Sequence, residues 1–255
     1  MSALRLPDFI IGGAPRSGTT WLYAVADRHP DLELAKPVVP EPKFFLRDDL
    51  YARGIKYYSD TWFASIPRGK IAGEKSTNYL ESAVAAERIH QCLPTARLLF
   101  VLRNPIDRAF SNFLWSRQNG VETEDFETAL ALEQDRELNT PEELRYARPH
   151  ALFSRGLYAE LLRPYFAYFP VEQIHVLRYE DIMTAPGTVA ESMHRFLGVS
   201  PRPQDGESQD ALNAAKEAHN GTMKPATRDQ LSARYAKANE QLYALLGPTF
   251  PVWPD

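Results

Sequence analysis

Short apolar runs alternate with amphipathic stretches along most of the chain. The runs have the length of buried strands and lie at 9–11, 70–74, 97–103 and 174–179. Apolar residues at helical spacing follow at 19–28, 82–92, from Pro105 onward, and at 156–169, 184–197 and 227–246. Alternating strands and helices are typical of a parallel sheet covered by helices. The pattern therefore predicts an α/β fold, a single domain over residues 1–255 with a central, mostly parallel sheet flanked by helices.

Two stretches interrupt this alternation. Residues 120–150 carry many acids and few strongly apolar positions, and residues 200–225 are polar with three prolines. We expect both to be irregular excursions over a ligand site or solvated connections. Four prolines between Pro30 and Pro42 also favour an extended segment there rather than a helix.

The composition narrows the class of protein. Of 255 residues, 44% are apolar and 24% charged, which excludes collagen-like, disordered and coiled-coil chains. A net charge of −4 disfavours nucleic acids as partners, so any anionic ligand must bind at a local basic site. The single cysteine, Cys92, excludes an internal disulfide framework. Residues 1–7 lack the pattern of a signal peptide and no apolar run is long enough for a membrane span, so we expect a cytoplasmic protein.

The most informative stretch is FIIGGAPRSGTTWL, at 9–22. A strand that runs through a glycine-rich turn into a helix presents backbone N–H groups to an anion. The spacing from Gly13 to Gly18 and Thr19-Thr20 follows the P-loop pattern of the nucleotide triphosphatases, but Thr19 replaces the usual lysine and Arg16 lies inside the loop. We interpret this as a P-loop-like site for a phosphate-like group, formed by Arg16, Ser17, Gly18, Thr19 and Thr20. The missing lysine disfavours magnesium-assisted γ-phosphoryl transfer, and we expect no metal.

A second candidate anion site lies in RLLFVLRNPIDRAFSNFLW, at 97–115. Arg103 ends the apolar strand and Ser111 follows eight residues later in the helix that Pro105 opens. A guanidinium fork and a hydroxyl donor at this spacing can both face one anion.

Together the two segments resemble the sulfotransferase family that uses 3′-phosphoadenosine 5′-phosphosulfate (PAPS). PRSGTTWL is similar to the family's 5′-phosphosulfate loop, and FVLRNPIDRAFSNF to its 3′-phosphate strand and helix. The resemblance implies that residues 16–20 hold the 5′-phosphosulfate, that Arg103 and Ser111 hold the 3′-phosphate, and that Trp21 lies near the adenine. It covers most of the chain, apart from 120–150 and 200–215.

The segment KPVVPEPKFF, at 36–45, resembles the base segment of the heparan-sulfate-type branch. That resemblance implies Glu41 as the catalytic base, with Phe44 and Phe45 packed beneath the site. Lys43 stands where the branch often has histidine, and we expect it, with Phe44, to face the acceptor.

GEKSTNYL, at 73–80, resembles another segment of the same branch. It implies Lys75 near the transferring group and Tyr79 near the acceptor. In this family a basic loop closes over the cofactor, and the resemblance implies Lys224 as its equivalent. The residues alone also allow a solvated lysine ahead of a helix.

The residues also leave alternatives open. His150 and His219 lie in the two interrupting stretches and are the other candidate bases. A P-loop small-molecule kinase, or a nucleotide-binding protein without catalysis, would share the phosphate loop. If the chain is a sulfotransferase, we expect it to transfer a sulfuryl group to a hydroxyl of a small-molecule, lipid or carbohydrate acceptor, and less readily to an amine. The acidic segment 120–150 favours a neutral or cationic acceptor over a polyanionic glycan.

Overall fold

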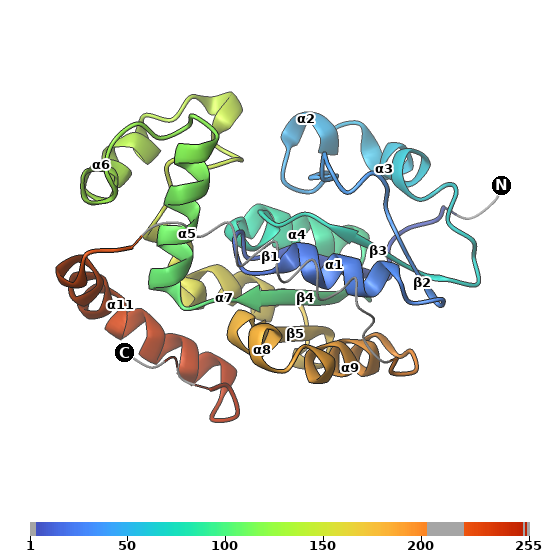
Figure 1. Ribbon diagram of the computed structural model, residues 1–255. Coiled ribbons are helices and arrows are strands. Elements are labelled where there is room, and N and C mark those ends of the chain that lie inside the picture. Colours follow the sequence, from blue (N-terminus) through green and yellow to red (C-terminus); the bar gives the residue numbers. More distant parts are fainter. Residues whose placement is uncertain (1–3, 203–221, 252, 254–255) are drawn as a thin grey trace.

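The centre of the molecule is a parallel β-sheet (Figure 1). The computed structural model describes residues 4–202, 222–251 and 253, and five strands pair within these ranges. The strands are β1 (Phe9–Gly13), β2 (Leu32–Leu34), β3 (Ile71–Lys75), β4 (Arg97–Leu102) and β5 (Ile174–Arg178). Their order is β2-β3-β1-β4-β5, and every pairing is parallel. The predicted α/β fold with a parallel sheet is confirmed.

Helices cover both faces of the sheet because the side chains of each strand alternate between two cores. Phe9 and Ile11 point into one core and Ile10 into the other. The first core is closed by α1 (Thr19–Asp27), α8 (Tyr179–Thr184) and α9 (Pro186–Leu197). The second is closed by α3 (Gly54–Trp62), α4 (Ala83–Cys92), α7 (Tyr158–Tyr168) and the end of α11 (Pro225–Leu246).

A third apolar cluster lies at the end of the sheet toward which β4 points (Figure 1). It joins α5 (Pro105–Gln118), α6 (Phe126–Leu138) and the first half of α11. Phe113 of α5, Phe126 of α6 and Tyr235 of α11 are each almost completely buried there. Within the described ranges, the remaining helices lie in connections between these elements. They are α2 (Asp48–Tyr51) and the short 3₁₀ helices η1 (Tyr79–Glu81), η2 (Glu142–Leu144), η3 (Ser154–Gly156) and η4 (Val171–Gln173).

The expectation of an irregular excursion over 120–150 is wrong, because α6 occupies thirteen residues of it. Asp125 caps that helix by accepting a hydrogen bond from the backbone N–H of Thr128 at 2.8 Å. The helix buries only Phe126, Ala129 and Glu133, so its apolar periodicity is too weak to see in the sequence. In the segment 200–225, positions 203–221 lie outside the described residues, and the assignment of all of 1–255 to one domain stays a prediction. Within the described ranges, no helix has both the length and the apolar character needed to span a membrane.

A buried histidine, His194, makes the stability of this fold sensitive to acid. The rings of His29 and His194 lie 4.7 Å apart, between the end of α1 and α9. Burial, and then the neighbouring His29, lower the pKa of His194 to about 4. An unfolded histidine titrates at about 6.5, so the unfolded chain binds more protons than the folded chain as the pH falls from about 6.5 toward 4.

We therefore expect the free energy of unfolding to fall by about 1–2 kcal/mol through His194 between pH 7 and pH 5. Urea denaturation at both pH values measures the effect, and His194→Gln should remove most of this loss. An equal loss in the variant and the wild type would contradict the assignment to His194.

Candidate active site

The carboxyl ends of β1, β3 and β4 meet at one edge of the sheet. Ile11 of β1 pairs with Lys75 of β3, and Gly13 pairs with Phe100 of β4. After β1, the chain adds β2 and β3 to the sheet on one side of β1, and then β4 and β5 on the other side. In open α/β sheets, ligands bind at such a reversal of strand order. The segments that follow β1, β3 and β4 therefore supply the candidate site.

The loop after β1 ends at the exposed start of a helix. Gly18 precedes α1 with φ 91°, in the left-handed region that favours glycine, and a Cβ there would lie 3.0 Å from the ring of Tyr179. No side chain caps α1, and its first turn contains no acid. Thr20, in that turn, is exposed, whereas Ser17 and Thr19 are buried. The first N–H groups of α1 can therefore bind an anion, which the helix dipole also favours.

The two arginines that the sequence analysis singled out lie beside this helix start. The Arg16 side chain donates from Nε to Ser111 Oγ at 3.3 Å, and Arg103 donates from Nη1 to the backbone oxygen of Arg16 at 3.3 Å. Burial, followed by the charge of Arg103, lowers the pKa of Arg16. An anion bound between two guanidinium groups relieves their mutual repulsion, which lowers the free energy of the complex. The residues present thus fit a ligand with more than one anionic group.

The neighbouring strand end carries a buried acid–base pair. Lys75 Nζ lies 2.6 Å from Glu41 Oε1, and the two side chains are 7% and 11% exposed. The hydroxyl and the backbone N–H of Thr77 donate to the same carboxylate, the N–H at 3.1 Å. Thr77 also lies against Gly13, where an added Cβ would come within 3.0 Å of the Thr77 carbonyl. The pair therefore lies at the edge of the phosphate loop, and it offers one proton acceptor and one cation.

A polar cluster that the sequence did not indicate lies next to this pair on β3. Glu74 is fully buried, and its carboxylate accepts a hydrogen bond from Ser76 Oγ at 3.1 Å. Burial raises the pKa of Glu74 to about 7, an effect that hydrogen bonding by Tyr58, Tyr79 and Ser76 partly offsets. The signal available in the sequence was an acid two residues after Ala72, on the face of β3 that points into the core.

The other predicted site residues near this edge are wholly or partly buried. Trp21, Phe44 and Tyr79 are at most 3% exposed, and Phe44 stacks on Tyr58 within the core. Lys43 is half-buried, with its ammonium group 5.5 Å from the centre of the Tyr146 ring, and burial lowers its pKa.

Two further candidates, Lys224 and His150, lie beside acids of the stretch 120–150. Lys224 is exposed and pairs with Glu127 of α6 at 3.0 Å, rather than with a residue of the phosphate loop. His150 lies 3.9 Å from Glu122, and His219 lies outside the described residues. Among the described His, Cys, Asp and Glu side chains, no group of three gathers as a metal site would require.

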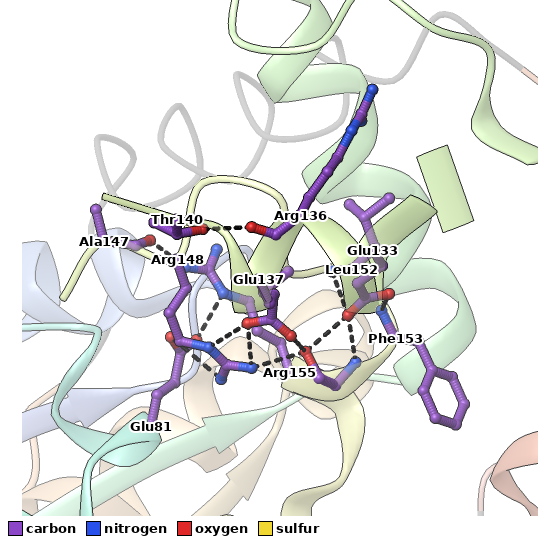
Figure 2. Close-up of polar contacts among 12 residues, drawn as sticks. Glu81, Glu133, Arg136, Glu137, Thr140, Ala147, Arg148, Leu152, Phe153 and Arg155 are labelled. Carbon is purple, nitrogen blue, oxygen red and sulfur yellow. Dashed lines mark hydrogen bonds and ion pairs between the residues drawn. The ribbon is translucent and has the colours of Figure 1, made fainter. Parts of the chain in front are cut away.

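Ion pairs fasten the stretch 120–156 to the rest of the site (Figure 2). Arg155 lies 2.9 Å from Glu81 of η1, and Arg148 lies 2.7 Å from Glu137 of α6. Glu133 accepts hydrogen bonds from three consecutive backbone N–H groups, at 152–154. These contacts connect the stretch to η1 through Arg155 and hold residues 152–154 against α6.

Comparisons with known proteins agree on one family. The family model for the sulfotransferase domain matches residues 6–232. A human bifunctional heparan sulfate N-deacetylase/N-sulfotransferase 3 is 31% identical over 207 residues, which are 77% of this chain and 23% of that protein. The membrane-associated sulfotransferase kil1 of Dictyostelium discoideum is 25% identical over 97% of this chain and 66% of that protein. The chain thus spans about a quarter of the human relative's length.

Solved structures support the same fold. A sulfotransferase from Alicyclobacillus acidocaldarius superimposes with a TM-score of 0.78 and 29% identity, covering 94% of this chain and 96% of that one. A mouse sulfotransferase, SULT7A1, crystallised with PAP gives a TM-score of 0.53 at 19% identity, over 86% and 69% of the two chains. The second likeness shows a shared fold.

The buried pair makes a prediction about stability. Lys75→Met leaves the Glu41 carboxylate buried without its cation, and we expect the free energy of unfolding to fall by about 2–3 kcal/mol. Adding Glu41→Gln should restore at least half of that loss, because the uncompensated charge is then gone. Urea denaturation measures both changes. Lys56→Met, which breaks an exposed pair with Asp60, is the matched control and should change stability by less than about 1 kcal/mol. An equal effect of the two lysine variants would contradict a buried pair.

Proposed function

The chain belongs to the sulfotransferase domain family, and from that premise we propose that it moves a sulfuryl group from PAPS to a hydroxyl or amino group of its acceptor, with Glu41 as the base. The observation that carries the proposal is the meeting of two anion-binding elements, at Arg16 and Arg103, beside the Glu41–Lys75 pair. The family leaves no ground for the kinase alternative. The proposed reaction uses no metal ion.

The donor is held, in this proposal, by the two strand ends. The start of α1, with residues 16–20, binds the 5′-phosphosulfate, while Arg103 and Ser111 bind the 3′-phosphate. The hydrogen bond from Arg16 to Ser111 supports this division, because it makes the two subsites neighbours. PAPS carries the activated sulfuryl group, and the chain supplies alignment and positive charge.

The transfer itself exchanges one bond to sulfur for another. The acceptor oxygen or nitrogen attacks the sulfur atom in line with the bond to the 5′-phosphate oxygen. As the new bond forms, the old bond breaks and its electron pair leaves with the phosphate of adenosine 3′,5′-bisphosphate (PAP). The acceptor's proton passes to a carboxylate oxygen of Glu41.

The positions of the cations give each a role. Lys75 holds Glu41 Oε1 from the end of β3, and Thr77 fixes the same carboxylate, so the base cannot turn away from the phosphate loop. Arg16 and Lys75 stabilise the charge that develops on the transferring group and on the leaving oxygen.

The acceptor is proposed from the relatives and the site together. The human relative's name places its transfer on nitrogen of heparan sulfate, so an amino sugar is the first acceptor to test and a hydroxyl the second. Small molecules and lipids complete the panel. A cytoplasmic setting remains part of the proposal, and one relative is described as membrane-associated.

The base assignment makes the first functional prediction. Glu41→Gln should lower kcat for sulfuryl transfer by at least about 100-fold, because the amide cannot accept the acceptor's proton. The affinity for PAP should stay within about twofold of the wild-type value, because the amide still accepts hydrogen bonds from Thr77 and the donor's phosphates bind elsewhere. Transfer of labelled sulfate and calorimetric titration measure the two quantities. Glu172→Gln, at an exposed position in η4, is the control. Undiminished turnover in Glu41→Gln would remove Glu41 from this role and bring His150 forward.

The assignment of Arg103 to the 3′-phosphate of the donor leads to a second functional prediction. Arg103→Ala should weaken PAP binding by about 10–100-fold, the free energy of a charge-assisted hydrogen bond. It should change binding of adenosine 5′-phosphosulfate, which lacks the 3′-phosphate, much less. Arg16→Ala should instead weaken both ligands. Calorimetry with the two nucleotides distinguishes the subsites, and an equal loss for both ligands in Arg103→Ala would contradict the 3′-phosphate contact.

A further inference from the structure

One buried acid has no part in the proposed transfer. Glu74 immediately precedes Lys75 on β3, and successive side chains of a strand point to opposite faces. Lys75 therefore reaches Glu41 while Glu74 points into the core, where it is completely buried. A buried carboxyl group is unfavourable unless hydrogen bonds satisfy it, so its neighbours indicate what it does.

Three hydroxyl groups surround the Glu74 carboxyl. Ser76 donates to it at 3.1 Å, and the neighbouring hydroxyls of Tyr58 and Tyr79 lower its pKa against the effect of burial. Glu41 contributes a repelling negative charge from the other side of the strand.

Two of these hydroxyls hold the turn that carries the base. Ser76 Oγ accepts a hydrogen bond from the backbone N–H of Lys43 at 2.9 Å. Tyr79 Oη accepts one from the backbone N–H of Phe45 at 3.3 Å. Lys43 has φ 48°, a left-handed conformation that a lysine rarely adopts without support. Glu41 is only two residues earlier in the same turn.

We propose that Glu74 is a positioning residue for the base: its carboxyl group orients the hydroxyls of Ser76 and Tyr79 so that they hold the 41–45 turn and keep Glu41 against Lys75. The inference rests on the proposed function, because it assigns Glu74 an effect on the base of that reaction.

The orientation follows from how a hydroxyl group bonds. A hydroxyl that donates its proton to Glu74 has its lone pairs free to accept a backbone N–H. If the acceptor is replaced by an amide, one carboxylate oxygen becomes an NH₂ donor, and one of the hydroxyls loses its acceptor. The buried hydroxyl must then turn toward another acceptor, and its bond to the turn weakens.

Tyr58 provides the matched control. Its hydroxyl faces Glu74 as that of Tyr79 does, and both residues are fully buried. Tyr79 accepts from the turn, whereas no bond from the backbone of the 41–45 turn to Tyr58 is present in the described structure. Tyr58→Phe and Tyr79→Phe therefore remove the same group from the same cluster, but only Tyr79→Phe removes a bond to the turn.

The test is a double-mutant cycle on the full-length chain, with kcat, the KM for PAPS and the affinity for PAP as readouts. We expect Glu74→Gln and Ser76→Ala each to lower kcat about tenfold, with PAP affinity and the KM for PAPS within about twofold of the wild type. The double variant should be no slower than the slower single variant, because both changes break one connection. Tyr79→Phe should lower kcat, and Tyr58→Phe should not.

Three outcomes would overturn the proposal. They are an unchanged kcat in Glu74→Gln, multiplied losses in the double variant, and equal losses from the two tyrosine variants. If Glu74→Gln does not fold, Ser76→Ala and the tyrosine pair decide the question. Failure of the proposed function is distinguishable, because Glu41→Gln would then keep its turnover, whereas failure of the Glu74 proposal leaves Glu41→Gln inactive.

Discussion

Parallel pairing of β1 with β3 on one side and β4 on the other brings three strand ends to the same edge of the sheet. Arg16 and Ser111 are 95 residues apart in the chain, and they make contact only because of this register. The register in turn depends on residues without side chains. A Cβ on Gly73 would come within 2.2 Å of the Phe9 ring, and one on Gly12 within 2.6 Å of the Phe100 ring. Tight packing across the sheet therefore fixes where the segments that carry Arg16, Lys75 and Arg103 leave the strands.

The distribution of charge explains how an acidic chain builds a cationic site. Arg16 and Arg103 concentrate positive charge at the start of α1. Three acids of 120–150 serve other purposes: Glu133 accepts hydrogen bonds from backbone N–H groups and Glu137 pairs with Arg148 (Figure 2), and Glu122 pairs with Arg136. The preference of this acidic segment for a neutral or cationic acceptor stays a prediction. The net charge of −4 is compatible with an anionic ligand at this local cationic site.

Local signals account for most of what the sequence predicts well. Helix α5 begins at Pro105 as expected, because Asn104 caps it and proline suits its first position. The strands β1, β3, β4 and β5 fall within two residues of their expected ranges, and the family prediction is confirmed. Strand β2 has only three residues, too few for an apolar period, and α6 was missed for lack of buried positions. The cluster at Glu74 and the pair of Arg155 with Glu81 escaped prediction because each joins segments that only the tertiary fold brings together.

The site combines several groups that burial alone would make unfavourable. Burial lowers the pKa of Arg16 and raises that of Glu74, and the Glu41–Lys75 pair is also largely removed from water. Each group weakens the folded state unless a partner satisfies it. The same desolvation strengthens electrostatic interactions with a bound ligand, since little water remains to screen them. An anion between Arg16 and Arg103 relieves their repulsion, so binding of the donor and stability of this edge of the sheet are linked. The two large apolar cores on either face of the sheet supply the stability that lets these groups stay buried.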